Sequence, residues 1–259
     1  MPAVNPGGFR AALIDIDGTL LKGDDAIPGA PETIHSLRKR GIPFRFCTNT
    51  TRRPRREIAA VLRAAGIQAD AQEVVAPSSL ARRVIVDSGD PRAALLVPEP
   101  SREDFDGVRE DNRAPAFVVL GDLGSGFTFD RLNDAFHWLR AGARLLALQK
   151  NRFWHAGNRG MLLDAGAFVA ALEYAAGITA RVVGKPSPEF FRLALEDLGM
   201  PAGDVVSVGD SLENDGAGAA AAGCRTILVR TGVFDAEELG RSIWQPDGVI
   251  DSIASLESL

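Results

Sequence analysis

The feature that most constrains the fold is a short apolar run, residues 11–14, that ends abruptly in acidic and turn residues. Runs of this length bounded by turn residues are typical of strands covered on both faces, as in parallel sheets. Asp15 and Asp17 lie two positions apart, so in an extended strand their side chains point the same way, and Gly18 lets the backbone turn away. Because neighbouring carboxylates repel each other unless a cation lies between them, this stretch is a candidate site. A plain strand followed by an Asp-Gly turn is the open alternative.

Strands and helices alternate along the first part of the chain. Residues 31–40 and 54–66 have the patterns of helices, and residues 42–47 between them have the pattern of a second strand. This spacing predicts an α/β fold, doubly wound around a parallel sheet. Ligands of such sheets bind beyond the carboxyl ends of the strands. Thr48 and Asn49 follow the second strand at such an end.

The middle of the chain repeats the alternation with elements of its own. Strands are predicted at residues 93–97, 116–120 and 144–148, and helices at residues 129–140 and 165–176. The pattern indicates a second α/β domain, residues 77–180, inserted into a core domain made of residues 1–76 and 181–259. A polar loop, residues 149–160, carries Phe153, Trp154 and His155. Such loops are candidates for substrate contact, and a plain surface loop is the equal alternative.

The final third of the chain again has the alternating strands and helices of the core domain. A helix is predicted at residues 189–198, and strands at residues 204–208, 225–229 and 248–250. Lys185 follows a short apolar run, and Asp210 and Asp215 follow the strand at residues 204–208. Four strand ends therefore carry polar groups, and these groups converge if the sheet is parallel.

Several carboxylates at one place require a hard cation, and oxygen ligands with open water positions suit Mg²⁺. A carboxylate that attacks a phosphate dianion meets repulsion of roughly 4 kcal/mol per pair of unit charges at 4 Å near a protein surface. Mg²⁺ and Lys185 would offset this repulsion and stabilise the developing charge.

The order of these four motifs along the whole chain resembles the haloacid dehalogenase-like (HAD) hydrolase superfamily. Residues 46–51 and 183–191 resemble its NagD-like subfamily, class IIA, in which an α/β cap is inserted between the second and third motifs. The resemblance implies a doubly wound core with an inserted α/β cap. It also implies a Mg²⁺-dependent phosphatase that hydrolyses a small phosphorylated metabolite through an aspartyl-phosphate, with specificity set by the cap, and a homodimer formed through the cap.

The resemblance implies a role for each catalytic residue. Asp15 would be the nucleophile, and Asp17 would protonate the leaving oxygen and then deprotonate the attacking water. Thr48 and Asn49 would bind the phosphoryl group. Lys185 would hold Asp15 and the phosphate as a compact point charge.

The resemblance also implies a metal site. Asp15, Asp210 and the backbone carbonyl of Asp17 would bind Mg²⁺. Asp215 is expected to support these ligands from behind, because Ser211 stands where many relatives have a second aspartate. Whether Asp215 binds the metal directly or through water stays open. The loop at residues 153–161 lacks the glycine-rich steps of close relatives, so the substrate stays open too.

Asp17 separates the nearest alternative chemistries. By family pattern a dehalogenase has no acid at this position, because halide leaves without a proton, so a phosphatase is favoured. The alternative from another class is a catalytically silent protein of the same fold that binds a phosphate ligand or serves as a scaffold. Four charged groups gathered at one place speak against it, because they are costly to keep together without a function.

Composition limits the partners and the location. The formal net charge of −5 argues against a general nucleic-acid binder. The first ten residues lack an apolar signal segment, and no run approaches the ~20 apolar residues of a membrane span, so we expect a cytoplasmic protein without a membrane partner. An arginine cluster at positions 52, 53, 55 and 56 is expected on a solvated helix face, with an anion site as the open alternative. Cys47 and Cys224 are expected to pack as small apolar residues, and neither as a nucleophile.

Overall fold

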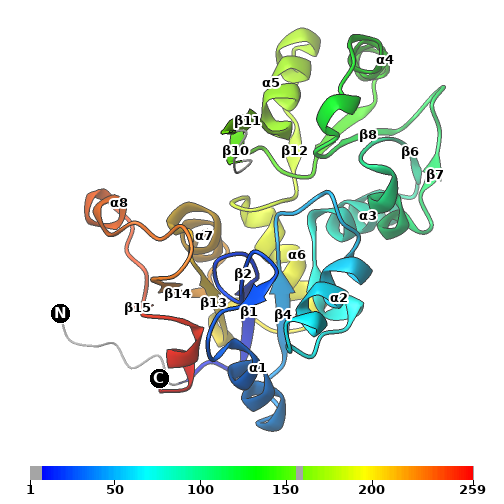
Figure 1. The fold of residues 1–259 in the computed structure, drawn as a ribbon. Coiled ribbons are helices and arrows are strands. Elements are labelled where there is room, and N and C mark those ends of the chain that lie inside the picture. The colour runs from blue at the N-terminus through cyan, green and yellow to red at the C-terminus, as the bar shows by residue number, and fades with distance from the viewer. Residues whose placement is uncertain (1–7, 156–159, 259) are drawn as a thin grey trace. The chain divides into compact units, whose positions relative to one another are not determined.

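The computed structural model describes residues 8–155 and 160–258, and the chain divides into two compact units (Figure 1). The first unit comprises Met1–Thr48, Arg55–Val75 and Lys185–Leu259, and the second comprises Asn49–Pro54 and Ala76–Gly184. Each unit has a parallel sheet of its own, so the predicted α/β fold is confirmed. Residues 49–54, 76 and 181–184, assigned to the core domain from the sequence, fall in the second unit.

The first unit contains a six-stranded parallel sheet in the order β15-β14-β13-β1-β4-β5. Its strands are β1 (Ala11–Asp15), β4 (Phe44–Cys47), β5 (Val74–Val75), β13 (Val205–Gly209), β14 (Arg225–Val229) and β15 (Gly248–Ile250). A small antiparallel hairpin of β2 (Leu21–Lys22) and β3 (Asp25–Ala26) follows β1. Because β1 lies between β13 and β4 and all three run parallel, their carboxyl ends meet at the same edge.

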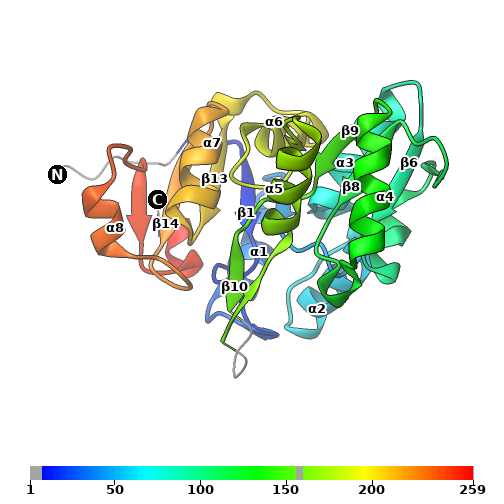
Figure 2. The same ribbon diagram turned by 90° about the horizontal axis from the view of Figure 1, so that it is seen from above.

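Helices cover both faces of this sheet (Figure 2). On one face, α1 (Ala30–Lys39) and α2 (Arg55–Ala64) bury Ile34 and Leu62 against Ile14 of β1. On the other face lie α6 (Pro188–Leu198) and α7 (Gly218–Ala221). A last helix, α8 (Ala236–Arg241), precedes β15. Each fully buried large apolar side chain contributes about 1.5–3 kcal/mol, and burial on both faces explains why β1 reads as a continuous apolar run.

The second unit contains a five-stranded parallel sheet in the order β12-β9-β8-β6-β7. Its strands are β6 (Arg92–Leu96), β7 (Arg109–Glu110), β8 (Phe117–Leu120), β9 (Arg144–Ala147) and β12 (Arg181–Val182). Its helices are α3 (Pro77–Asp87), α4 (Phe129–Arg140) and α5 (Ala165–Ala176), and the last two pack together on one face of the sheet. The 3₁₀ helix Glu99–Phe105 packs beside α3.

Helices α4 and α5 have the bounds predicted from the sequence, because local signals define their ends. The side chain of Thr128 accepts a hydrogen bond from the Arg131 amide at the start of α4. Asp164 likewise accepts from the Ala165 amide at the start of α5, and Gly177 ends α5 with a φ of 68°.

The predicted polar loop at residues 149–160 contains a strand instead. Phe153–His155 forms β10, which pairs antiparallel with β11 (Met161–Leu163), so that Phe153 faces Leu163 and Trp154 faces Leu162. Its pairing partner, β11, lies beyond the predicted loop in the sequence. The polar residues around Trp154 have the pattern of a loop, so the strand was not predicted. Residues 156–159 of this loop lie outside the described residues.

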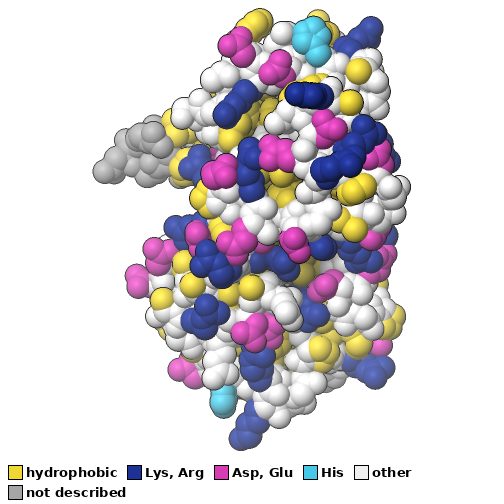
Figure 3. All heavy atoms as spheres, turned by 90° about the vertical axis from the view of Figure 1, so that its right-hand side faces the viewer, with side chains coloured by type: hydrophobic (Ala, Val, Ile, Leu, Met, Phe, Trp, Pro, Cys, Tyr) yellow, Lys and Arg dark blue, Asp and Glu magenta, His cyan; other side chains and the backbone are white. Residues whose placement is uncertain are grey.

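No helix among the described residues is long and apolar enough to cross a membrane. On the face drawn in Figure 3, basic and acidic side chains are interspersed over the described residues.

Candidate active site

Asp15 lies at the carboxyl end of β1 and is buried, with 6% of its surface exposed. Its Oδ1 accepts a hydrogen bond of 2.5 Å from Lys185 Nζ, and its Oδ2 accepts one of 3.2 Å from Thr19 Oγ1. Both oxygens are therefore held in place by the protein.

Lys185 connects two buried carboxylates. Its Nζ lies 2.5 Å from Asp15 Oδ1 and 2.6 Å from Asp215 Oδ1, and its side chain is 3% exposed. Burial by itself lowers the pKa of Lys185, but the attraction of the two carboxylates outweighs it and raises the pKa. The ammonium group is therefore charged at neutral pH.

Three carboxylates gather around this lysine. Asp15, Asp210 and Asp215 are all buried, and each offers an oxygen atom within 4.8 Å of the other two. Burial, followed by repulsion from Asp215, raises the pKa of Asp15, and burial raises that of Asp210 to about 6. With all three ionised, Lys185 leaves two negative charges unbalanced. Oxygen ligands with excess negative charge fit a hard divalent cation.

Asp215 is placed differently from the other two carboxylates. Its Oδ1 accepts from Lys185 Nζ, and its Oδ2 accepts from the Ser211 amide at 3.1 Å. Both of its oxygens are thus already hydrogen-bonded to the protein. This agrees with a supporting role behind the metal ligands, and that role stays a prediction.

Two glycines make room for Asp210. Its Oδ2 accepts a 2.7 Å hydrogen bond from the Val233 amide. A Cβ atom added to Gly232 would lie 1.8 Å from this oxygen, and one added to Gly18 would lie 2.0 Å from it. Thr231 Oγ1 in turn donates to the Gly18 carbonyl at 2.6 Å. The segment after β14 therefore helps to position Asp210. The sequence analysis did not identify this segment as part of the site. Its place directly after the predicted strand at residues 225–229 could have indicated it.

We expect Gly232→Ala to displace Asp210 and so to weaken metal binding. Gly23→Ala is the matched control, because Gly23 has nearly the same φ, 66° against 67°, and nothing lies within 4 Å of its added Cβ. Both substitutions carry the backbone strain of roughly 1–2 kcal/mol, and Gly232→Ala alone adds the clash. The measurements are the free energy of unfolding and the Mg²⁺ concentration for half-maximal activity. An equal Mg²⁺ requirement in the two variants would contradict the role given to Gly232.

Asp17 lies beyond β1, which ends at Asp15. The Ile16 carbonyl accepts hydrogen bonds from the amides of Leu20 and Leu21, so the chain turns here. The prediction that an extended strand carries both acids is therefore wrong, and the two differ in burial: Asp15 is buried and Asp17 is exposed. An exposed acid next to a buried one suits exchange of protons with water.

The second motif is divided between the two units. Thr48 is buried and directly follows Cys47, the last residue of β4, which pairs with Asp15 at the end of β1. Asn49 belongs to the second unit, so its predicted contact with the phosphoryl group stays a prediction.

The two cysteines do not act as nucleophiles here. Both thiols are buried. Burial raises the pKa of Cys47, and it raises that of Cys224 to about 11. The thiols are therefore protonated at neutral pH.

Comparison with known proteins identifies the family. A model of haloacid dehalogenase-like hydrolases matches residues 12–109, and a HAD-hydrolase-like model matches residues 182–256. The phospholysine phosphohistidine inorganic pyrophosphate phosphatase of Rattus norvegicus is 37% identical over 258 residues, which cover 97% of this chain and 94% of that protein. The chain belongs to the haloacid dehalogenase-like hydrolase family.

Further relatives narrow the position within this family. The haloacid dehalogenase-like hydrolase domain-containing protein 2 of Bos taurus is 37% identical over 230 residues, 89% of this chain and 87% of that protein. Among solved structures, NagD from E. coli K-12 matches with a TM-score of 0.87 at 25% identity, covering 95% of this chain and 98% of NagD. The p-nitrophenyl phosphatase of Archaeoglobus fulgidus matches with a TM-score of 0.89 at 28% identity, covering 97% of this chain and 100% of that phosphatase. The predicted NagD-like relationship is confirmed, and the chain is a phosphatase of this family.

Proposed function

We propose that this phosphatase hydrolyses a small phosphorylated metabolite through an aspartyl-phosphate formed on Asp15, with Mg²⁺ as its metal. The observation that carries the proposal is the buried ammonium of Lys185, which holds one oxygen of Asp15 beside two further carboxylates. The hydrogen bond from Lys185 fixes the direction of this carboxylate, and the charge of the ammonium favours its anionic form against the burial that disfavours it.

In the first half-reaction, a carboxylate oxygen of Asp15 forms a bond to phosphorus while the bond from phosphorus to the leaving oxygen breaks. Asp17 gives its proton to that leaving oxygen. In the second, Asp17 takes a proton from a water molecule whose oxygen attacks phosphorus. The bond between phosphorus and Asp15 then breaks, which releases phosphate and restores the carboxylate.

The other residues of the site bind and orient the groups that react. Lys185 holds the Asp15 oxygen and attracts the phosphoryl group, and Thr48 and Asn49 donate hydrogen bonds to phosphoryl oxygens. Mg²⁺, held by Asp15, Asp210 and the backbone carbonyl of Asp17, supplies positive charge that offsets the repulsion between the nucleophile and the phosphate.

The names of the relatives guide the proposed substrate class. One group is named for phospholysine, phosphohistidine and inorganic pyrophosphate, and another for p-nitrophenyl phosphate. These compounds share the phosphoryl group and little else. We therefore assign phosphoryl chemistry to the first unit and substrate choice to the second unit, including Phe153, Trp154 and His155. A cytoplasmic location and a homodimer through the second unit are proposed by resemblance.

We expect EDTA to abolish hydrolysis of p-nitrophenyl phosphate and excess Mg²⁺ to restore it, because the three carboxylates hold more negative charge than Lys185 balances. Release of p-nitrophenol gives the rate. EDTA added together with excess Mg²⁺ controls for inhibition by the chelator itself. Full activity after exhaustive chelation would remove the metal from the proposal. No turnover of any phosphorylated compound with Mg²⁺ present would favour the catalytically silent alternative.

A further inference from the structure

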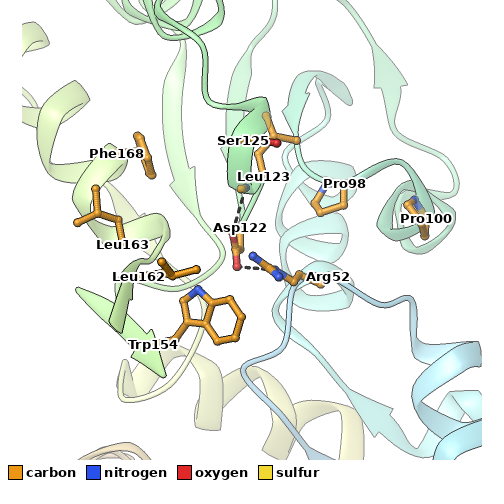
Figure 4. Close-up of a pocket in the computed structure, with 11 residues that line it drawn as sticks. Arg52, Pro98, Pro100, Asp122, Leu123, Ser125, Trp154, Leu162, Leu163 and Phe168 are labelled. Atoms are coloured by element: carbon orange, nitrogen blue, oxygen red, sulfur yellow. Dashed lines mark hydrogen bonds and ion pairs between the residues drawn. The ribbon is translucent and has the colours of Figure 1, made fainter. Parts of the chain in front are cut away.

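The second unit contains a cavity of about 570 Å³, and all the residues that line it belong to this unit (Figure 4). Its walls are mostly apolar, and Leu123, Leu162 and Phe168 form a large part of them. Small-molecule sites measure about 300–1,000 Å³ and combine apolar walls with a few polar groups. The cavity has the size and the wall chemistry of such a site.

Among the described residues that line this cavity, Arg52 is the cation. The sequence predicts it on a solvated helix face with three other arginines, but α2 begins only at Arg55 and Arg52 lies in the cavity wall. Its Nε donates a 2.6 Å hydrogen bond to Asp122 Oδ2. The predicted helix is therefore wrong for this residue, whereas the predicted exposure to solvent holds.

Asp122 is itself held firmly, with 11% of its side chain exposed. Its amide donates to Thr51 Oγ1 at 2.9 Å, and its Oδ1 accepts from the Gly124 amide at 3.0 Å. One edge of the Arg52 guanidinium is thus attached to a fixed support. Its Nη1 and Nη2 form no hydrogen bond with any residue that the structure describes, and 44% of the side chain is exposed.

Trp154 fixes the guanidinium from another direction. The Arg52 guanidinium carbon lies 4.7 Å from the centroid of the Trp154 ring. Figure 4 shows the indole beside Arg52 and Asp122, with Leu162 next to it. A stacked and hydrogen-bonded arginine presents its remaining donors in a set direction, with little entropy left to lose on binding.

We propose that this cavity binds a small organic anion, in which a carboxylate or phosphate group is joined to an apolar, flat body. The Nη1 and Nη2 donors of Arg52 would hold the anionic group. Leu123, Leu162 and Phe168 would contact the body. The proposal does not depend on the catalytic chemistry proposed for Asp15, because it involves no residue of the first unit.

Other ligand classes fit the cavity less well. A purely apolar ligand would remove water from the Arg52 donors without replacing their hydrogen bonds. A simple inorganic anion would leave the apolar walls unused. A cation would face Arg52, while Asp122, the carboxylate among the lining residues that the structure describes, already accepts from the protein with both oxygens.

The test is titration calorimetry on the full chain in EDTA, with phenylphosphonate and benzoate as probes. We expect saturable binding of at least one of them, and the tighter of the two identifies the preferred anionic group. Methylphosphonate, which lacks the ring, and benzyl alcohol, which lacks the charge, should each bind about 10-fold more weakly or worse. Quenching of tryptophan fluorescence gives a second measure, because Trp154 lies in the wall.

Arg52→Gln should weaken the binding of the preferred probe by about 10-fold or more, as removal of a hydrogen bond to a charged group does. Arg53→Gln is the matched control, since it removes the same charge from an exposed neighbour that does not line the cavity, and it should bind like the wild type. Arg52→Gln/Asp122→Asn avoids leaving a buried carboxylate unpaired, should remain folded, and should show the same loss.

Three outcomes would overturn the proposal. The first is that the wild type shows no saturable binding at millimolar probe concentration. The second is that the wild type and both Arg52 variants bind the preferred probe equally well. The third is that methylphosphonate binds as tightly as phenylphosphonate. Asp15→Asn should leave probe binding unchanged, so a failure here is distinguishable from a failure of the proposed catalytic chemistry.

Discussion

Asp15→Asn is expected to lower the turnover of p-nitrophenyl phosphate on the order of 10⁴-fold or more, the scale of loss for an essential nucleophile. An amide oxygen does not attack phosphorus to form an acyl phosphate. The folded state should survive, because the amide oxygen still accepts from Lys185, and Lys185 keeps its bond to Asp215. Far-ultraviolet circular dichroism and steady-state rates make the comparison.

The control for this variant is Asp25→Asn, an exposed aspartate in β3, which should have wild-type activity. The intermediate offers an independent test. Borohydride reduction of enzyme quenched during turnover should convert Asp15 to homoserine, because it reduces an acyl phosphate and leaves a free carboxylate unchanged. Near-wild-type turnover by Asp15→Asn, or reduction at a different residue, would contradict the assignment of the nucleophile.

Lys185→Met is expected to have the largest effect on stability. It leaves the buried carboxylates of Asp15 and Asp215 without their cation, next to that of Asp210. Removing one partner from a buried ion pair costs about 3–5 kcal/mol of unfolding free energy. Activity should be lost as well, since the attacking oxygen is no longer held. Urea denaturation in EDTA measures the cost, and Mg²⁺ should recover part of it by supplying positive charge to the same carboxylates.

Lys150→Met is the matched control for this prediction. Lys150 also pairs with an acid, Glu173, but 40% of its side chain is exposed. Exposed pairs contribute about 0–1 kcal/mol. Lys185→Met should therefore lower the free energy of unfolding several-fold more than Lys150→Met does. The double variant Lys185→Met/Asp215→Asn should regain part of the lost stability, because one uncompensated charge is gone. Equal costs for the two lysine variants would show that Lys185 is not an essential counter-ion.

Much of the fold was predictable because its signals are local. The ends of α4 and α5 depend on Thr128, Asp164 and Gly177, each of which acts on amides or carbonyls within its own turn. The apolar run of β1 is equally local, since burial on both faces leaves no room for polar residues. By contrast, β10 was missed because it is stabilised by pairing with β11, and its own residues resemble a loop.

The candidate site was predictable in its members and less so in its geometry. Asp15 and Asp210 stand at the ends of β1 and β13, and a parallel sheet brings such ends together. Lys185 was expected at a further strand end of the same sheet, but the strand before it, β12, belongs to the sheet of the second unit. The different surroundings of Asp15 and Asp17 were not predictable, because they depend on where β1 stops and the chain turns. The contacts of Arg52 were not predictable for a similar reason: its partners, Asp122 and Trp154, lie far along the chain.

The sequence by itself determined the alternation of the main strands and helices, the order of the four polar motifs and the family to which the chain belongs. These properties depend on residue types and on spacing along the chain. Only the tertiary structure decided that Lys185 joins Asp15 to Asp215, that Gly232 makes room for Asp210, and that Arg52 lines a cavity. Each of these contacts joins residues distant in sequence, and their distances and burial are set only when the separate segments pack together.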